Sequence, residues 1–357
     1  MGGYYSIANY AEATVTTMAI ISPYDSDKHA LMNARVSVLI PAYNAAAYIE
    51  QTIESVLAQT WPDVEIIVVD DGSRDETMAK ALRYTSSHVQ VVTQPNAGAS
   101  AARNRAFSLC TGEYIQYLDA DDLLHPDKIR AQMACFQLRS EAQLSSSAWA
   151  IFYKMPSERD LHPTILWHDY ADPVQWLLDA WEEGVWMQPS AWLTHRSLIE
   201  AAGPWNEQIS LHDDGEFFSR VLLRSSGVVF CGEAKSFYRK GIANSLSSMR
   251  SEKATRSHLA VCQAYEAHVL ARRDDTVARQ ACANNYQRLI YEYYPEHAKV
   301  RQVAAARVLA LGGSTTKPHS TPIFRLVDKV LGWQLSKRLQ RFVYEHRLNP
   351  AAGKANT

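Results

Sequence analysis

The sequence has few cysteines, and they do not fall in pairs. It contains 5 cysteines in 357 residues, with no C-x-x-C spacing. Small disulfide-stapled domains and zinc cages need clustered cysteines, so both classes are excluded. We therefore expect reduced, core-forming thiols in a cytosolic protein. The five are Cys110, Cys135, Cys231, Cys262 and Cys282.

A charge surplus and long apolar runs are also missing. The 36 Lys+Arg and 38 Asp+Glu give a net charge of −2, whereas a general nucleic-acid binder needs a basic surplus. No stretch approaches the roughly 18 apolar residues of a membrane span. Residues 1–33 lack the basic and apolar segments of a signal peptide, so we expect a loosely ordered extension there.

From residue 35 onward the chain shows a regular alternation of apolar strands and amphipathic helices. This alternation, with continuous apolar strands, predicts a parallel, doubly wound α/β sheet. Ser73 and Glu76 have the spacing of a capping box that would open one of the helices. The remainder of the chain divides into an irregular, Trp-rich stretch at 140–210 and a largely helical region from about 251 onward. The predicted strands are 36–40, 64–69, 89–92 and 114–118.

Three of the predicted strands end in unusual polar segments. These segments are Pro41–Asn44, Asp70–Ser73 and Asp119–Asp122. Ligands of doubly wound sheets bind at the carboxyl ends of the strands, so we expect the three segments to converge on one ligand-binding rim.

The acidic segment Asp119–Asp122 suits a divalent metal ion. The two outer acids of the D-x-D spacing, Asp119 and Asp121, point the same way on an extended chain. Carboxylates with water and phosphate oxygens are the usual ligands of Mg²⁺ or Mn²⁺. An acidic turn that caps the helix after Pro126 is the alternative.

Taken together, six motifs between residues 36 and 122 resemble glycosyltransferase family 2, whose members are inverting nucleotide-sugar enzymes. The motifs are Val36–Asn44, Ile67–Ser73, Gln94–Gly98, Ala102–Asn104, Gly112–Tyr114 and Leu118–Asp122. The resemblance implies a GT-A type fold, which is a Rossmann-like doubly wound mixed sheet, here with a C-terminal helical extension. It also implies three regions: an extension at 1–33, a GT-A domain at 34–250 (34–122 for the donor, 123–250 for acceptor and base) and a helical region at 251–357.

The resemblance also assigns nucleotide-sugar-binding roles. Pro41 and Tyr43 would lie at the nucleotide base, with Asp71 accepting a hydrogen bond from it. Arg103 would steady the donor phosphates. Asp121, with Asp119, would hold an Mn²⁺ or Mg²⁺ ion. The full set of expected donor-site residues is Pro41, Tyr43, Asn44, Asp70, Asp71, Arg103, Asp119 and Asp121.

The segment 212–220 resembles the family's acidic pair before a helix, in which the second acid is the catalytic base. Asp213 and Glu216 fit an N-cap and its capping-box partner, which leaves Asp214 without a capping duty. We therefore predict that Asp214 is the base. His212 has an alternative interpretation as a distant metal ligand, although a single histidine rarely is one.

Aromatic and C-terminal segments complete the sequence-based hypothesis. Trp186 and Trp192 are candidates for stacking on an acceptor sugar, although most tryptophans here are expected in the core. By resemblance, Arg239 and Ser245 would belong to a loop over the donor diphosphate. The tail from Pro322 has the pattern of a basic amphipathic helix, which lies either on an anionic membrane or against the catalytic domain.

The predicted function is metal-dependent, inverting transfer of a sugar from a nucleotide sugar, with UDP as the expected nucleotide. The acceptor would be a glycan or lipid-linked hydroxyl in cell-surface polysaccharide or glycoconjugate synthesis. We expect a cytoplasmic enzyme, with peripheral contact at the inner membrane face if the tail binds lipid. The alternatives are an inactive nucleotide-sugar binding protein and a nucleotidyltransferase. The latter would need a Gly-rich phosphate loop, which segment 41–47 is not.

Overall fold

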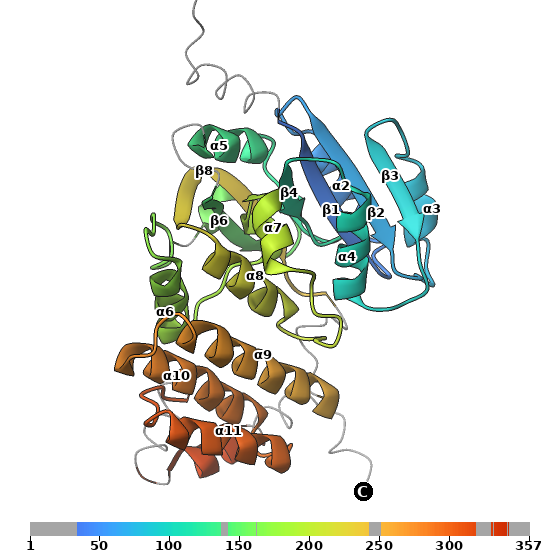
Figure 1. Ribbon diagram of the computed structural model, residues 1–357. Helices are drawn as coiled ribbons and strands as arrows, with labels where there is room; N and C mark the ends of the chain where they lie inside the picture. Colours follow the sequence, from blue (N-terminus) through green and yellow to red (C-terminus); the bar gives the residue numbers. More distant parts are fainter. Residues whose placement is uncertain are drawn as a thin grey trace, which may run out of the picture.

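A computed structural model describes residues 34–136, 142–161, 163–242, 251–318, 330, 332–340 and 342. Its main feature is a five-stranded sheet of order β3-β2-β1-β4-β7 (Figure 1). The first four strands run parallel, and β7 is antiparallel to β4, so the sheet is mixed as predicted. Its strands are β1 (Val36–Ala42), β2 (Val64–Asp70), β3 (Val89–Thr93), β4 (Tyr114–Tyr117) and β7 (Thr194–His195).

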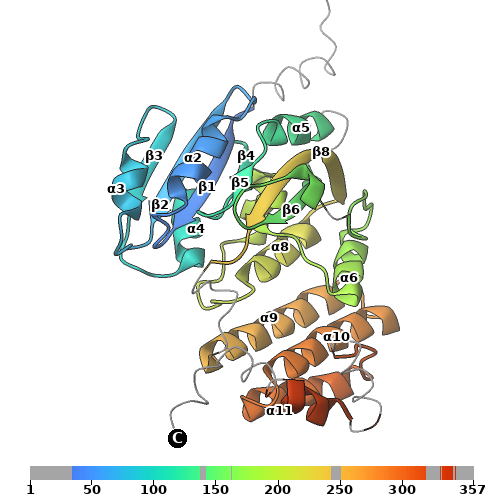
Figure 2. The ribbon, with the colours of Figure 1, turned by 180° about the vertical axis from the view of Figure 1, so that it is seen from behind.

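Helices cover both faces of this sheet, which explains why its strands are continuously apolar. The helices α2 (Ile49–Leu57) and α3 (Thr77–Leu82) lie on one face, and α4 (Ala99–Leu109) lies on the other (Figures 1 and 2). Within β1, Val38 and Ile40 pack with α2, whereas Leu39 packs with α4. Strands β1, β2 and β4 therefore each contribute to two hydrophobic clusters.

The register of the strands aligns their carboxyl ends. Ala42 of β1 pairs with Asp70 of β2, and Asp70 pairs with Thr93 of β3. The segment that begins at Asp119 follows directly after β4, where the Leu118 N–H donates to the carbonyl of Leu39. The polar segments predicted from the sequence thus lie along the same edge of the sheet.

A second, three-stranded sheet of order β5-β8-β6 lies beside the first. It consists of β5 (Leu123–Leu124), β8 (Val228–Arg239) and β6 (Leu144–Phe152), and α5 (Lys128–Phe136) packs on it. The expectation of irregular structure over 140–210 is wrong, because this stretch holds β6, α6 (Pro173–Glu183), α7 (Arg196–Ala202) and the 3₁₀ turns Glu158–Asp160 and Pro189–Ala191. Three fully buried serines at 145–147 interrupt the apolar pattern of β6, which is why the sequence did not reveal it.

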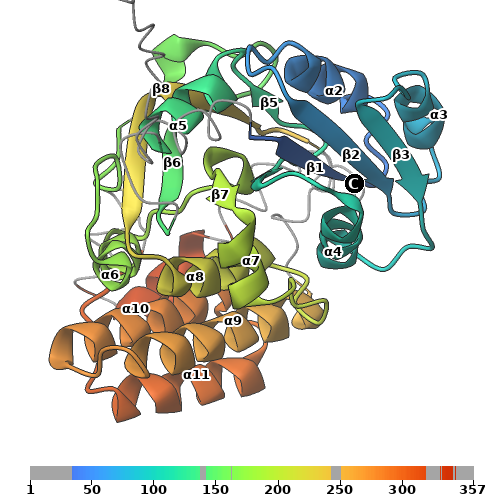
Figure 3. The ribbon, with the colours of Figure 1, turned by 45° about the horizontal axis from the view of Figure 1, so that its top comes forward.

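The C-terminal helices form a layer against α8 (Asp213–Arg224), as Figures 1 and 3 show. They are α9 (Glu252–Leu270), α10 (Thr276–Tyr293) and α11 (Ala298–Ala310). One hydrophobic cluster runs from Leu39 in β1 through Phe217 in α8 to Val308 in α11. The helical region predicted from the sequence therefore shares its core with the sheet.

The capping box expected from Ser73 and Glu76 is wrong: α3 begins only at Thr77, and the Ser73 hydroxyl accepts a hydrogen bond from the Asn44 N–H instead. Leu57 and Leu82, the last residues of α2 and α3, are about half exposed. None of the five cysteines, all of which lie within the described residues, forms a disulfide; four are buried, and Cys135 is partly exposed.

Most of the predicted basic tail lies outside the described residues. Within the described part, residues 332–340 are helical, and Trp333 packs edge-on against Tyr291 and Tyr294. Arg338 lies over the Tyr294 ring, while Val330 and Phe342 are exposed. Within the ranges that the structure describes, no helix has both the length and the apolar character needed to cross a membrane.

Candidate active site

A buried arginine joins two acidic segments at the rim of the sheet. Arg103 of α4 is 5% exposed and donates hydrogen bonds of 2.7 Å both to Asp119 and to Asp213. Its guanidinium lies 4.3 Å above the ring of Trp205. The two carboxylates raise the pKa of Arg103 against the opposing effect of burial, so the side chain stays charged. The structure therefore gives Arg103 two protein partners at the place where the sequence predicted a phosphate contact.

The turn Asp119–Asp122 holds three carboxylates, and the pKa values of two of them, Asp121 and Asp122, are raised. Burial, and then the charge of Asp119, raise the pKa of Asp121 to about 7. Burial and the two neighbouring acids raise the pKa of Asp122 well above its usual range. One oxygen of the Asp122 carboxylate, Oδ2, is buried without a hydrogen-bond partner. A cation at this turn would stabilise the ionised carboxylates.

Arg239 at the end of β8 supports the backbone of this turn. Its N–H donates to Asp122 Oδ1 (2.9 Å), its Nε donates to the Asp121 carbonyl (2.8 Å), and Nη2 donates to Gln51 Oε1. The guanidinium also packs between the rings of Tyr48 and Phe152. Arg239 thus holds the acidic turn in place. Ser245, its predicted companion in a diphosphate loop, lies outside the described residues.

Helix α8 presents the predicted base, but the expected capping box is wrong. Asp213 is the first helical residue and accepts from Ser100 and Arg103, because the buried arginine is a stronger partner than the helix N–H groups. Glu216 forms an ion pair with Arg220 at 2.8 Å. The N-cap position is taken by His212, which has the left-handed backbone angles φ 60° and ψ 27°.

Asp214 has the properties of a proton acceptor. Burial, followed by the charge of Asp213, raises its pKa to about 7, while the Gly215 N–H and Arg103 oppose the shift. A carboxylate with a raised pKa holds a proton more readily, which suits general-base work near neutrality. Asp214 lies at the same helix end as Asp213, and Arg103 links Asp213 to Asp119.

The C-terminal helices contribute a tyrosine to this helix end, which the sequence analysis missed. The hydroxyl of Tyr265 in α9 lies so close to Gly215 that an added Cβ there would be 2.0 Å from it. The Tyr265 ring stacks on Trp181 at 4.6 Å. Only a residue without a side chain fits between Asp214 and this hydroxyl. No local pattern in the sequence signals such a long-range contact.

Asp70 and Asp71 both lie buried at the end of β2. The Asp71 carboxylate accepts hydrogen bonds from two side chains and two backbone N–H groups of the loop 94–98. These four donors occupy the acceptor positions that the sequence analysis reserved for a nucleotide base. Asp70 accepts from Ser73 and Thr93, and its Oδ1 is buried without a partner.

The segment after β1 offers one open aromatic ring. Tyr43 is 47% exposed at the strand end, whereas Pro41 is buried within β1. Asn44 adopts a left-handed φ of 50° and accepts from the Arg74 N–H, so it shapes the turn. Tyr43 and Asn44 are both exposed, but the Asn44 side chain is engaged in the turn, which leaves the Tyr43 ring available for contact with a ligand.

The two predicted acceptor tryptophans differ in exposure. Trp192 is 1% exposed and stacks on Phe218, so the prediction that it binds an acceptor is wrong: it fills the core. Trp186 is 43% exposed and lies beside Trp149 and Tyr238, with ring centroids 5.0 and 5.4 Å away. Trp186 remains a surface on which a sugar ring can stack.

Sequence comparison identifies the family of the sheet-forming half. Residues 37–192 match the sequence model of Glycosyl transferase family 2. The chain is 43% identical over 100 residues to the uncharacterized glycosyltransferase YibD of Escherichia coli K12, covering 27% of this chain and 29% of YibD. It is 44% identical over 96 residues to a chondroitin synthase of E. coli, covering 26% of this chain and 14% of the synthase. The match thus spans less than a third of either relative.

Solved structures share the fold. S. aureus TarS (residues 1–349, in complex with UDP-GlcNAc) superposes with a TM-score of 0.62 at 16% identity, covering 78% of this chain and 81% of that one. The mannosyltransferase PcManGT from Pyrobaculum calidifontis gives 0.53 at 17% identity, with 89% and 88% covered. These likenesses confirm the predicted GT-A type fold. The sequence match over residues 37–192 places this part of the chain in glycosyltransferase family 2.

Proposed function

We propose that the protein is a metal-dependent inverting glycosyltransferase that moves a sugar from a nucleotide sugar, specifically a UDP-sugar, to a hydroxyl group. The acceptor is a glycan or a lipid-linked molecule in the synthesis of cell-surface polysaccharide or glycoconjugate. The observation that carries the proposal is the Arg103 bridge, because it brings the D-x-D acids and the helix end with Asp214 to one rim.

The comparisons support a nucleotide-sugar donor. The TarS structure contains UDP-GlcNAc, and the PcManGT structure contains GDP-Man with Mn²⁺. Both share this fold, and the family motifs of this chain line the corresponding strand ends. Tyr43 would offer its exposed ring to the nucleotide base.

The acidic turn fits a divalent ion. Asp119 and Asp121 supply carboxylate oxygens, which are the ligands that Mn²⁺ and Mg²⁺ prefer. Burial, followed by the charge of Asp119, raises the pKa of Asp121, and a bound cation would oppose this shift. When bound, such an ion would offset the negative charge on the departing nucleoside diphosphate.

The residues of the chain account for the remaining chemistry. The acceptor oxygen forms a bond to the anomeric carbon as the bond from that carbon to the diphosphate breaks, and Asp214 takes the proton from the acceptor hydroxyl. Attack opposite the leaving group inverts the anomeric configuration. Arg103 joins the two carboxylate segments, and Arg239 holds the backbone of the acidic turn; together they supply the orientation that such a displacement requires.

Exposed apolar side chains in residues 330–342 support the proposal that the protein contacts the inner membrane face peripherally. Val330, Leu335, Leu339 and Phe342 are at least 40% exposed, and basic residues alternate with them in the sequence. Trp333 fixes the segment to α10 without covering these side chains. Contact of this kind would place the active site near a lipid-linked acceptor.

The test measures donor binding and slow donor hydrolysis across a nucleotide-sugar panel with Mn²⁺ or Mg²⁺. In Asp121→Ala we expect loss of metal-dependent donor binding. In Asp214→Asn we expect retained binding with turnover reduced about 10²- to 10⁴-fold, the usual contribution of a general base. The exposed Asp160→Asn is the control and should match the wild type.

Several outcomes would contradict the proposal. Absence of metal-dependent binding to every nucleotide sugar would overturn the function while leaving the fold intact. Donor binding without any transfer, unaffected by Asp214→Asn, would instead indicate a binding protein. A product with retained anomeric configuration would overturn the inverting mechanism.

A further inference from the structure

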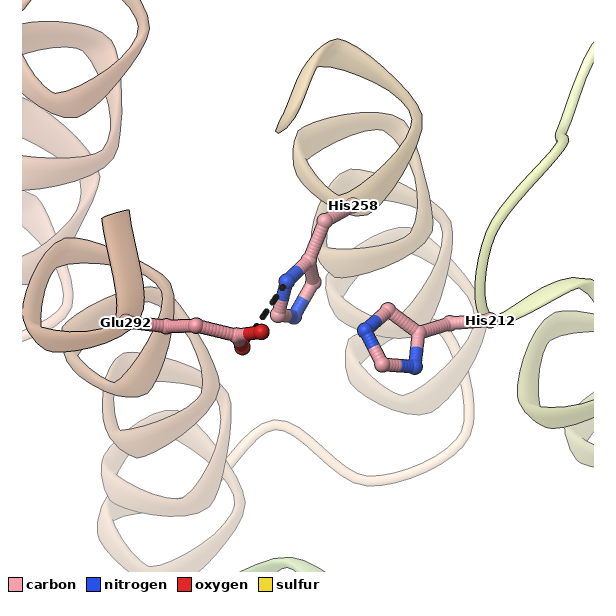
Figure 4. A group of neighbouring side chains, drawn as sticks. All are labelled: His212, His258 and Glu292. Atoms are coloured by element: carbon pink, nitrogen blue, oxygen red, sulfur yellow. Dashed lines mark ion pairs between the residues drawn. The ribbon is translucent and has the colours of Figure 1, made fainter. Parts of the chain in front are cut away.

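We propose that His212, His258 and Glu292 form a second metal site, separate from the acidic rim and suited to Zn²⁺. The three side chains point toward one another from three elements: the residue before α8, α9 and α10 (Figure 4). No part of the proposed sugar transfer uses them.

The distances require little rearrangement. One ligand atom from each residue lies within 4.8 Å of the others, and His258 Nδ1 is 3.7 Å from Glu292 Oε2. The centroids of the two imidazole rings are 4.3 Å apart. With bonds of about 2.0–2.2 Å, the ligands of a tetrahedral zinc ion lie about 3.3–3.5 Å apart. Small side-chain rotations therefore suffice to enclose an ion.

The donor types distinguish this site from the D-x-D turn. Two imidazole nitrogens with one carboxylate oxygen form a ligand set typical of Zn²⁺ with one open position, whereas Mg²⁺ prefers oxygen ligands alone. His212 is exposed, and His258 and Glu292 are partly exposed, so an ion can enter from solvent.

Backbone contacts hold the two histidines opposite each other. Ser257, the neighbour of His258, accepts hydrogen bonds of 3.0 Å from the N–H groups of Ser210 and Leu211 and donates to the Leu211 carbonyl. This hydroxyl is buried, so the segment that leads into His212 is fixed to α9. The left-handed conformation of His212, rare outside glycine, then directs the chain into α8.

The proposed site would join the start of α8 to two C-terminal helices. A ligand that binds only the folded chain stabilises it, so Zn²⁺ should strengthen this junction. A simple ion pair between His258 and Glu292 is the competing explanation, and it predicts no metal affinity.

The experiment uses the full chain, stripped of metal by a chelator and then titrated with Zn²⁺ against a chromogenic competitor. We expect the wild type to bind Zn²⁺ and its unfolding temperature to rise. His258→Gln and Glu292→Gln should each lower the affinity at least about tenfold and remove the thermal shift. Co²⁺ in place of Zn²⁺ should give visible absorption bands of a four-coordinate ion, which the variants lose.

Two controls locate the site. His88→Ala removes an exposed histidine directly before the edge strand β3, and Asp121→Asn weakens the acidic rim; both variants should keep the high-affinity zinc. Equal affinity in the wild type and both glutamine variants would overturn the proposal, as would zinc binding that Asp121→Asn abolishes. If His258→Gln does not fold, the more conservative Glu292→Gln decides the matter. Zinc binding is measured without donor, so its outcome is independent of sugar transfer.

Discussion

Arg103 and Asp213 form a buried ion pair at 2.7 Å between positions 110 residues apart in the sequence. This contact attaches α8 to α4, and the second branch of the guanidinium attaches Asp119. The spacing between the proposed metal-site acids and the proposed base therefore depends on one side chain.

Replacing Arg103 should separate the effects on activity and stability. Arg103→Lys keeps the charge but cannot bridge both carboxylates in the same geometry, so we expect turnover to fall at least about tenfold. Arg103→Ala removes the cationic partner of two carboxylates and should cost about 3–5 kcal/mol of unfolding free energy. Denaturant unfolding and donor turnover check the two effects. Arg105→Ala, a change on the exposed side of α4, is the control; equal behaviour of all three variants would contradict the bridging role.

We expect Asp71 to stabilise the loop 94–98 even when no ligand is bound. Asp71→Asn replaces an acceptor of four hydrogen bonds with an amide that turns an N–H₂ group toward some of those donors. We expect a loss of about 2 kcal/mol or more in unfolding free energy, measured without nucleotide. An unchanged stability together with weaker donor binding would instead support direct contact with the base.

Gly215→Ala should destabilise α8 through the Tyr265 hydroxyl. The added methyl would lie 2.0 Å from that oxygen, and the stacked, packed ring has little room to move. Overpacking of this kind costs about 1–3 kcal/mol. The double variant Gly215→Ala/Tyr265→Phe removes the clashing oxygen and should recover part of the loss in thermal unfolding. Full additivity of the two substitutions would show that the contact is unimportant.

Glu65 should make stability depend on pH in the acid range. Burial alone would raise its pKa, but donors at Ser37, Thr111 and Gly112 lower it below the ordinary 4.5. A lowered folded-state pKa contributes stability above pH 4.5, and this contribution disappears as the pH falls through the folded value. Glu65→Gln should therefore cost about 1.5–3 kcal/mol at pH 7, and this difference in stability should shrink as the pH is lowered below 4.5. A difference that stays constant as the pH falls through the acid range would refute this.

The exposed apolar residues of 330–342 should govern membrane association. The double variant Leu335→Asp/Leu339→Asp should sediment less with anionic vesicles than the wild type, because it removes apolar area and adds repulsive charge. Neutral vesicles provide the comparison lipid, and the exposed Val303→Asp on α11 provides the comparison variant. If wild type and double variant sediment equally, the segment does not bind the membrane.

The sheet and its rim could be predicted because their signals are local. Runs such as Val64–Val69 are long, apolar and bounded by turn residues, so they indicate buried strands in any context. The rim followed from the polar residues at their ends. The helix that begins at Asp213 was likewise predicted, from the acidic pair that precedes it in the family pattern.

The contacts that shape the site were hidden because they are long-range. Asp213 has the local pattern of an N-cap, yet an arginine from α4 takes its carboxylate. Ser145 and its neighbours look like loop residues until hydrogen bonds such as that from Gln132 to the Ser145 carbonyl satisfy a buried strand. The requirement for glycine at position 215 follows only from the fold, in which α9 places the Tyr265 hydroxyl against that residue.

The buried hydroxyl of Ser257 joins α9 to the segment before α8, and this connection limits which parts of the chain can be exchanged by recombination. A chimaera that exchanges residues 251–318 for those of another family member severs three hydrogen bonds that position Ser210 and Leu211, just before α8. The C-terminal helices therefore cannot be exchanged on their own. A functional chimaera has to begin upstream of Ser210, so that α8 and the C-terminal helices that contact it come from the same protein.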